Sequence, residues 1–202
     1  MEAATQTRPL PGDKAARIVD AMRESVAARG AAGSTFDHVA REAGVSRGLL
    51  HYNFGTKERL LVEVVRRDCD IRMAALDDAL SGARTADDFI DVLLRSLEDV
   101  VEHDPAFFTL IFEIFTLARR NDEIAAEMAE LVRRTRAGLA ELLETKQREG
   151  VLDLAEEPDA IAAVLFALGD GLALSALSDP GRDLRPTLRA GVACARTLLG
   201  AK

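Results

Sequence analysis

The segment Ser34–Leu61, STFDHVAREAGVSRGLLHYNFGTKERLL, decides the fold of this chain. Ser34 and Thr35 are alternative N-caps for a short helix, because their hydroxyl oxygens accept hydrogen bonds from its first backbone N–H groups. Gly44 is the residue type that most readily adopts a left-handed turn, and Ser46 then caps the next helix. Two short helices joined by a tight glycine turn predict a helix-turn-helix.

The second helix of this motif has two chemically different faces. A helix that lies in the major groove of DNA needs apolar side chains on its inner face and hydrogen-bonding side chains on its outer face. The inner face is predicted to contain Val45, Leu50 and Phe54. The outer face is predicted to contain Arg47, His51 and Tyr52. This division favours DNA contact over an ordinary buried helix.

Helical periodicity continues on both sides of the motif, and no convincing strand pattern interrupts it. A first helix starts at Asp13 and stops at Gly30 and Gly33, and Thr56 caps a long fourth helix. Further helices are expected at about 86–102, 105–119, 122–148, 158–178 and 184–199. The sequence therefore predicts an all-α protein of about nine helices. We expect an N-terminal tail and DNA-binding domain over 1–57 and a larger helical body over 58–202.

Charge is distributed unevenly along the 202 residues, whose net charge is −8. Residues 1–67 contain 11 Lys or Arg and 8 Asp or Glu, a net charge of +3. The remainder contains 15 basic and 26 acidic residues, a net charge of −11. A basic head on an acidic body permits phosphate binding at one end only, although it does not prove it.

The sequence gives no sign of a membrane or secreted protein. Its longest uncharged apolar run, AIAAVLFALG, lies between Asp159 and Asp170 and is too short to span a bilayer. The N-terminus, MEAATQTRPLPGDK, lacks the apolar run of a secretory signal. We therefore expect a cytoplasmic protein that does not bind membranes. Cys69 and Cys194 are expected to be small core or surface residues, because neither has a neighbouring Cys or His at metal-ligand spacing.

These motifs resemble the tetracycline-repressor (TetR) family of bacterial transcription regulators. The likeness is close over residues 14–65, through TFDHVAREAGVSRGLLHYNFGTKERLL and its AGVS-x-G…F-x-x-K-E-x-L pattern. The body resembles the family in length, in helix count and in the C-terminal GDGLALSALSDPG, which looks like a dimerisation segment. The resemblance implies a homodimer that binds a double-stranded DNA operator and responds to a small-molecule effector.

Nine residues of the head are the predicted DNA contacts. They are Thr35, Ser46, Arg47, Gly48, Leu49, His51, Tyr52, Asn53 and Lys57. His51 stands where the family usually has a phosphate-contacting Tyr, so Tyr52 or His51 itself must replace that phenol. Leu49 takes a place often held by a small polar residue, which suggests contact with a thymine methyl group. Taken singly these residues also suit a plain helix end, and His38 on the preceding helix is expected to be solvated.

The segment DPAFFTLIFEIFTLARR predicts a central helix, because it is apolar on nearly every side. Phe107, Phe108, Ile111, Phe112 and Phe115 are expected on one face. A phenylalanine cluster is either plain core or the wall of a small-molecule cavity, and the resemblance brings the two interpretations to even weight. The residues predicted to contact an effector are Phe108, Phe112, Glu113, Arg136, Phe166 and Asp170.

The charge of the effector is left open by these residues. Glu113 is expected to be exposed, to pair with Arg133, Arg134 or Arg136, or to face a cationic ligand. A mostly apolar ligand with a basic group would use Glu113 or Asp170, whereas an acid would use Arg136.

The last two helices are expected to form the dimer interface, and the alternative is that they cover their own core. Their apolar stripes are Ile161, Val164, Leu165, Leu168 and Leu172, followed by Leu188, Val192, Ala195 and Leu199. Two heads are needed to bind two half-sites about one helical turn apart.

The function predicted from the sequence is a ligand-responsive transcriptional regulator, a repressor released from its palindromic operator by the effector. One alternative is an all-helical enzyme that uses His103, Glu113 or Asp170, and another is a protein-binding adaptor that does not bind DNA. The sequence contains no nucleophile-base spacing, metal constellation or phosphate loop, so we expect no catalytic residues, metal or cofactor.

Overall fold

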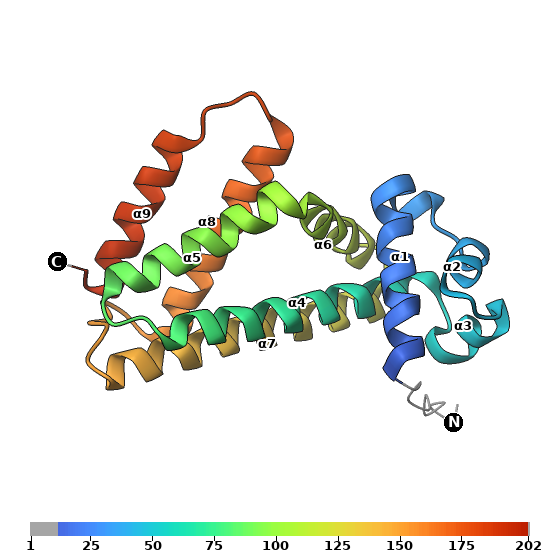
Figure 1. Ribbon diagram of the computed structural model, residues 1–202, viewed down its shortest axis with the longest axis horizontal. Helices are drawn as coiled ribbons and strands as arrows, with labels where there is room; N and C mark the ends of the chain where they lie inside the picture. The colour runs from blue at the N-terminus through green and yellow to red at the C-terminus, as the bar shows by residue number, and fades with distance from the viewer. Residues whose placement is uncertain (1–11, 202) are drawn as a thin grey trace. The chain divides into compact units, whose positions relative to one another are not determined.

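The computed structural model describes residues 12–201, and all regular structure within that range is helical (Figure 1). The helices are α1 Gly12–Gly33, α2 Phe36–Ala43, α3 Arg47–Phe54, α4 Lys57–Ser81, α5 Ala86–His103, α6 Pro105–Ala118, α7 Asp122–Arg148, α8 Pro158–Ser178 and α9 Arg185–Leu199. The all-α class is confirmed, and the expected bounds of the body helices agree with those observed to within one residue.

The chain packs into two compact units. Of the described residues, the first contains those up to Asp68 together with Thr109–Ala129, and the second contains Cys69–Phe108 and those from Glu130 onward. Helices α4, α6 and α7 each contribute residues to both units. These units are defined by packing and combine segments that are distant in sequence, so they do not test the predicted domain boundary between residues 57 and 58. That boundary stays a prediction.

Glycine conformations end the helices of the head where the sequence predicts. Gly30 has a φ of 69° and a ψ of 169°, which interrupts α1 one turn before its last residue. The Ser34 hydroxyl donates a hydrogen bond to the Gly30 carbonyl oxygen at 2.9 Å, so Ser34 braces this kink while Thr35 caps α2. Gly44 adopts the left-handed conformation, with φ 64° and ψ 38°, between α2 and α3.

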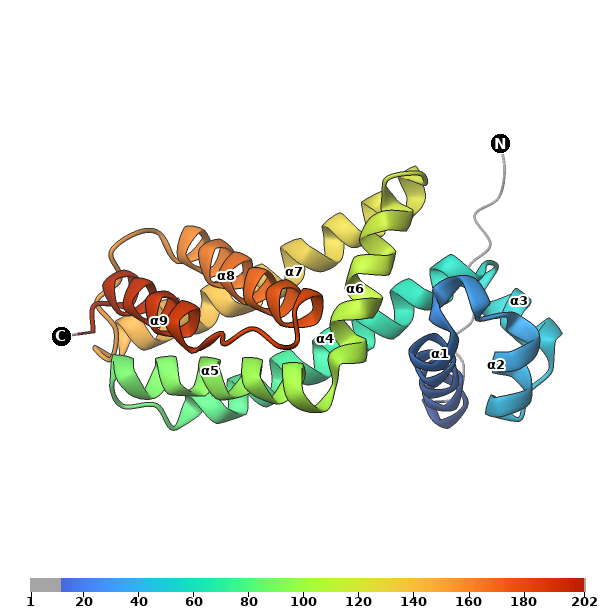
Figure 2. The same ribbon diagram turned by 90° about the horizontal axis from the view of Figure 1, so that it is seen from above.

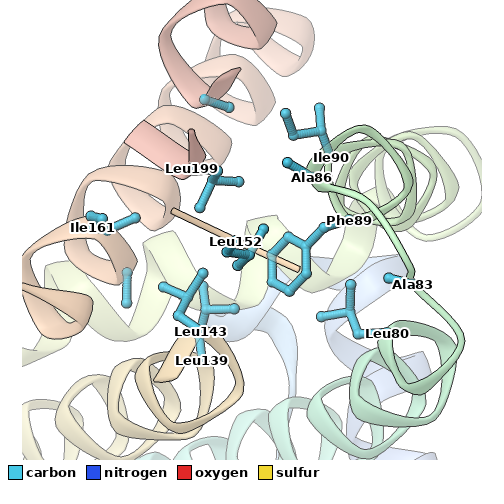
Figure 3. Packing of buried hydrophobic residues seen from close by; sticks show 12 residues of the cluster. Leu80, Ala83, Ala86, Phe89, Ile90, Leu139, Leu143, Leu152, Ile161 and Leu199 are labelled. Carbon is cyan, nitrogen blue, oxygen red and sulfur yellow. The ribbon is translucent and has the colours of Figure 1, made fainter. Parts of the chain in front are cut away.

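The core of the second unit is built around Phe89 of α5. In Figure 3 this ring points among leucines from α4, α7 and the loop after α7, and towards Ile161 of α8 and Leu199 of α9. Helices α5, α8 and α9 pack against one another within this unit (Figure 2). The Phe89 side chain is fully buried core.

Helix α8 is the most apolar long helix of the described chain. By length and composition it could cross a membrane, since its most apolar 18 residues have a mean hydropathy of 2.0. Only 17% of these residues are buried inside the structure. One such helix is weak evidence for a membrane span. Its exposed face contains Ala160, Ala163, Val164, Ala167, Asp170, Gly171 and Leu174.

The stripe of α8 and α9 predicted for the dimer interface was partly wrong. Ile161, Ala195 and Leu199 are buried in the core cluster of their own unit, and Leu165 and Val192 pack against it. The alternative weighed from the sequence, that these helices cover their own core, therefore holds for this side of each helix. The opposite side of α8 is the one left exposed.

Candidate nucleic-acid interface and effector region

The outer face of α3 presents polar side chains above an apolar anchor. Leu50 is fully buried, and Val39 and Ala40 of α2 are buried beside it in the head. Arg47, His51 and Tyr52 are exposed, and 64% of the Tyr52 surface remains accessible. The predicted outer face of α3 is therefore a surface in the structure.

Two hydroxyl groups mark the N-termini of the motif. Thr35 Oγ1 accepts a hydrogen bond from the His38 N–H at 3.3 Å, and Ser46 Oγ accepts one from the Leu49 N–H at 3.2 Å. Each hydroxyl keeps its own hydrogen for donation, and both residues are exposed. A helix N-terminus combined with a free hydroxyl donor suits a phosphate oxygen.

The remaining predicted contacts differ in accessibility. Gly48 is exposed, and its missing side chain leaves room for close backbone approach, since a Cβ there would meet only Ser46 Oγ at 4.0 Å. Leu49 and Asn53 are half-buried, and Asn53 Nδ2 donates to the Leu49 carbonyl oxygen at 2.7 Å. One end of the Asn53 amide is therefore used inside the helix.

Lys57 occupies a more internal position than the sequence suggests. It is half-buried, and its Nζ donates a hydrogen bond to the Ala31 carbonyl oxygen at 2.8 Å. An ammonium group has three donors, so phosphate contact by the others stays a prediction. The structure adds a second role, in which Lys57 fastens the start of α4 to the end of α1.

Arg47 belongs to a polar network that links α2 and α3. Its Nε donates to His51 Nε2 at 3.3 Å, and its Nη1 lies 3.3 Å and 3.2 Å from the two carboxylate oxygens of Asp37. His51 Nδ1 lies 3.3 Å from the Gly55 carbonyl oxygen. The contact of Asp37 with Arg47 was not predicted from the sequence.

His38 is only half-buried, yet its Nδ1 atom is enclosed and finds no hydrogen-bond partner among the described residues. The expectation of a solvated side chain was therefore wrong for this atom. Nothing in the structure explains the missing partner.

The phenylalanines of α6 do not share one environment. Phe107 and Phe108 are buried and meet edge to face with ring centroids 5.4 Å apart, whereas 57% of the Phe115 surface is accessible. Phe115 therefore lies outside the buried pair formed by Phe107 and Phe108. Arg72, which sequence reasoning missed, lies over the Phe107 ring at 4.4 Å and pairs with Asp104.

The arginines expected beside Glu113 are paired with other carboxylates. Arg133 pairs with Glu130, Arg134 with Asp70, and Arg136 with Asp159 through a 2.7 Å contact of its Nε atom. Glu113 itself is half-buried. Of the three alternatives left open for Glu113, the ion pair with one of these arginines was therefore wrong.

The six predicted effector contacts fall in both compact units. Phe112 and Glu113 belong to the first unit, whereas Phe108, Arg136, Phe166 and Asp170 belong to the second. Phe166 packs against the core cluster of its unit. Asp170 is exposed as a residue, yet partial burial of its carboxyl group raises the pKa of that group above its ordinary value.

Comparison with known proteins agrees with this geometry. The model of the bacterial regulatory proteins of the tetR family matches residues 18–64, and that of the C-terminal region of BetI-type transcriptional repressors matches residues 90–199. The transcriptional regulator BetI of Rhizobium meliloti is 28% identical over 158 residues, which cover 77% of this chain and 73% of that protein.

Two solved structures share the fold. A transcriptional regulator from Saccharomonospora viridis in complex with choline has a TM-score of 0.71 at 21% identity and covers 91% of this chain and 95% of its own. The regulator FadR from Bacillus subtilis in complex with stearoyl-CoA has a TM-score of 0.70 at 18% identity, covering 93% of this chain and 98% of its own. Because the head and more than half of the chain match the two family models, the chain belongs to the tetR family of bacterial transcription regulators, with a BetI-type C-terminal region.

Proposed function

We propose that the chain is a homodimeric repressor that binds a palindromic operator through α3 and leaves it when an organic cation binds the body. The observation that carries the proposal is the exposed face of α3, where Arg47, His51 and Tyr52 stand on a helix anchored by fully buried Leu50. Such a face matches the hydrogen-bonding groups of the major groove. On this account the protein is a cytoplasmic regulator and has no catalytic site.

The operator is read by residues among the nine predicted from the sequence. Thr35, Ser46 and Lys57 contact phosphate oxygens, and Tyr52 takes the place of the missing phenol at position 51. Arg47 reaches a base edge, and Leu49 contacts a thymine methyl group. The Asn53 amide group contacts the DNA backbone through the atoms that are not bonded to the Leu49 carbonyl oxygen.

Dimerisation uses the exposed side of α8. Ala160, Ala163 and Ala167 allow close approach of a second helix, and Val164 and Leu174 supply apolar area to bury. Val164 is 44% exposed and Leu174 is 50% exposed. A symmetric partner that covers this face would place two heads on two half-sites.

The effector is a cation of mostly apolar character. Arg136 already pairs with Asp159, which disfavours the alternative of an acidic ligand held by Arg136. Glu113 is half-buried without one of the expected arginines, and the Asp170 carboxyl group is partly desolvated. Either carboxylate would gain from a positive ligand, and aromatic rings attract such a charge. The choline bound by the regulator from Saccharomonospora viridis belongs to this chemical class.

Release of the operator depends on which helices belong to the first unit. The segment Thr109–Ala129 packs with the head in one compact unit, and Arg66 of α4 pairs with Glu127 of α7 at 2.7 Å. A ligand that moves α6 would therefore also move the helices that carry the head.

Selection of genomic DNA fragments by the purified protein tests the proposal. We expect fragments that share an inverted repeat, with binding that weakens as salt rises. Choline and 3,3-dimethylbutyrate, a carboxylate of similar size without a cationic group, are then added separately. Release by the cation supports the proposal, whereas release only by the acid would overturn the effector class, and absence of selective DNA binding would overturn the regulator itself.

A further inference from the structure

His51 is locked between a donor and an acceptor. Its Nδ1 faces the Gly55 carbonyl oxygen at 3.3 Å, and its Nε2 faces the Arg47 Nε–H at 3.3 Å. The Phe36 ring packs edge-on against the imidazole, with centroids 4.8 Å apart. The ring is exposed to solvent, but its orientation is set from three sides.

These partners permit one protonation pattern. A carbonyl oxygen only accepts hydrogen bonds, so Nδ1 must carry the hydrogen. A guanidinium only donates, so Nε2 must present its lone pair. In the neutral ring these partners favour the tautomer with hydrogen on Nδ1, and the bond from that hydrogen fixes what the other nitrogen does.

The same contacts occupy most of the Arg47 guanidinium. Its Nε is bound to His51, and its Nη1 is bound to both carboxylate oxygens of Asp37. Among the described residues, Nη2 has no hydrogen-bond partner. An arginine contacts guanine in a bidentate manner with two nitrogens, either Nε and Nη2 or Nη1 and Nη2. In Arg47, Nε is already bonded to His51 and Nη1 to Asp37.

We propose that Asp37 and His51 are positioning residues that make Arg47 present Nη2 alone to the DNA. This inference rests on the proposed DNA contact by α3. A single donor bonds equally well to an acceptor of guanine or to the O4 acceptor of thymine. The contacted base position in the operator therefore accepts guanine or thymine, although an unconstrained arginine would favour guanine.

Two variants remove the constraint with little change to the fold. His51→Phe keeps a ring against Phe36 but removes both nitrogens, and Asp37→Ala removes the carboxylate. The base position is located first with Arg47→Ala, as the position whose preference disappears when binding sites are selected from random DNA. We expect the wild-type protein to accept guanine or thymine there and each variant to prefer guanine by about tenfold.

The controls separate positioning from a structural effect. Arg47→Ala has no guanidinium group, so combining it with His51→Phe should add no preference for guanine. A uniform loss of affinity in His51→Phe and Asp37→Ala, with no change in base preference, would overturn the inference. So would a wild-type protein that already prefers guanine as strongly as the variants do.

A measurement without DNA tests the network independently. The nitrogen chemical shifts of the imidazole, recorded by NMR in mildly alkaline buffer, distinguish the two neutral tautomers. We expect hydrogen on Nδ1 in the wild-type protein and loss of this preference in Arg47→Ala. Hydrogen on Nε2 would overturn the inference even if the operator is bound. Failure of the wild-type protein to select any DNA would instead refute the proposed function and leave this test standing.

Discussion

Lys146 of α7 donates hydrogen bonds from its Nζ to the Ser81 carbonyl oxygen at 3.2 Å and to the Ala83 carbonyl oxygen at 3.4 Å. Only 6% of the Lys146 surface is accessible. The last carbonyl groups of α4 have no partners inside their own helix, and cations are favoured at that end by the helix dipole. A buried ammonium group therefore closes the C-terminus of α4.

Replacing Lys146 with methionine should destabilise the protein. The substitution keeps an unbranched chain of similar length but leaves the Ser81 and Ala83 carbonyls without this donor, which should cost about 1–3 kcal/mol in the free energy of unfolding. Urea unfolding measures this value. The control is Glu149→Gln, which removes only the exposed charge paired with Lys146. Equal stability of Lys146→Met and the wild-type protein would show that the cap is dispensable.

Gly200 ends α9 in a position that excludes a side chain. Its φ is +69°, and a Cβ there would lie 2.3 Å from the Asp153 carbonyl oxygen. Gly150 has a φ of +75° but open space around it. Gly150→Ala should therefore lower the free energy of unfolding by about 1 kcal/mol, because alanine is strained at positive φ. Gly200→Ala should lower it further, because the backbone must also move to make room for the Cβ atom. Thermal unfolding of both variants compares the two costs, and equal losses would contradict the steric argument.

Local signals in the sequence predicted most of the fold. Thr35, Gly44 and Ser46 have the cap and turn roles assigned to them because such roles depend on neighbouring backbone atoms alone. The end of α7 and the start of α8 could be predicted in the same way, because Gly150 follows the first helix and Pro158 opens the second for local reasons.

Contacts between distant residues were not predictable in the same way. Periodicity placed Leu199 and Phe115 on apolar faces, but it does not show which face meets a partner. Leu199 is core and Phe115 is largely exposed. The pairing of Asp37 with Arg47 depends on the angle between α2 and α3, which no residue pattern states. The partners of Arg136 were missed for the same reason.

Tyr52 should contribute to operator binding without contributing to folding. Because its side chain is largely exposed, Tyr52→Ala should leave the unfolding transition unchanged while weakening operator affinity by roughly 1–3 kcal/mol. Tyr52→Phe separates the hydroxyl group from the ring. If the phenol contacts phosphate, Phe should lose as much as Ala in a gel-shift titration. Unchanged affinity in both variants would remove Tyr52 from the interface.

Leu174→Arg should disrupt the dimer and spare the fold of the single chain. An arginine at this half-exposed position meets solvent in a monomer, but it would be buried without a partner in the proposed interface. Sedimentation should show a folded monomer with weaker operator binding. Val132→Arg on α7 is the matched control, because Val132 is 46% exposed but lies outside α8. A dimer that withstands Leu174→Arg would place the interface elsewhere.

Asp170→Asn should change stability and ligand response in opposite directions. The raised pKa of Asp170 means that folding disfavours its ionised form. The contribution of this group to stability therefore falls as the pH rises from the pKa of the unfolded state to the pKa of the folded state. At neutral pH the neutral amide removes that penalty, and ligand-free Asp170→Asn should melt above the wild-type protein.

A cationic effector reverses the comparison. It would pair with the ionised carboxylate, so saturating choline should raise the melting temperature of the wild-type protein more than that of Asp170→Asn. Glu113→Gln tests the second candidate carboxylate in the same titration, and Arg136→Met should leave the response unchanged because Arg136 is paired with Asp159. A response that is lost only in Arg136→Met, and obtained only with carboxylate ligands, would assign the opposite charge to the effector. An equal response of the wild-type protein and Asp170→Asn to choline would leave Asp170 outside the site, because a carboxylate that binds the cation must lose affinity when its charge is removed.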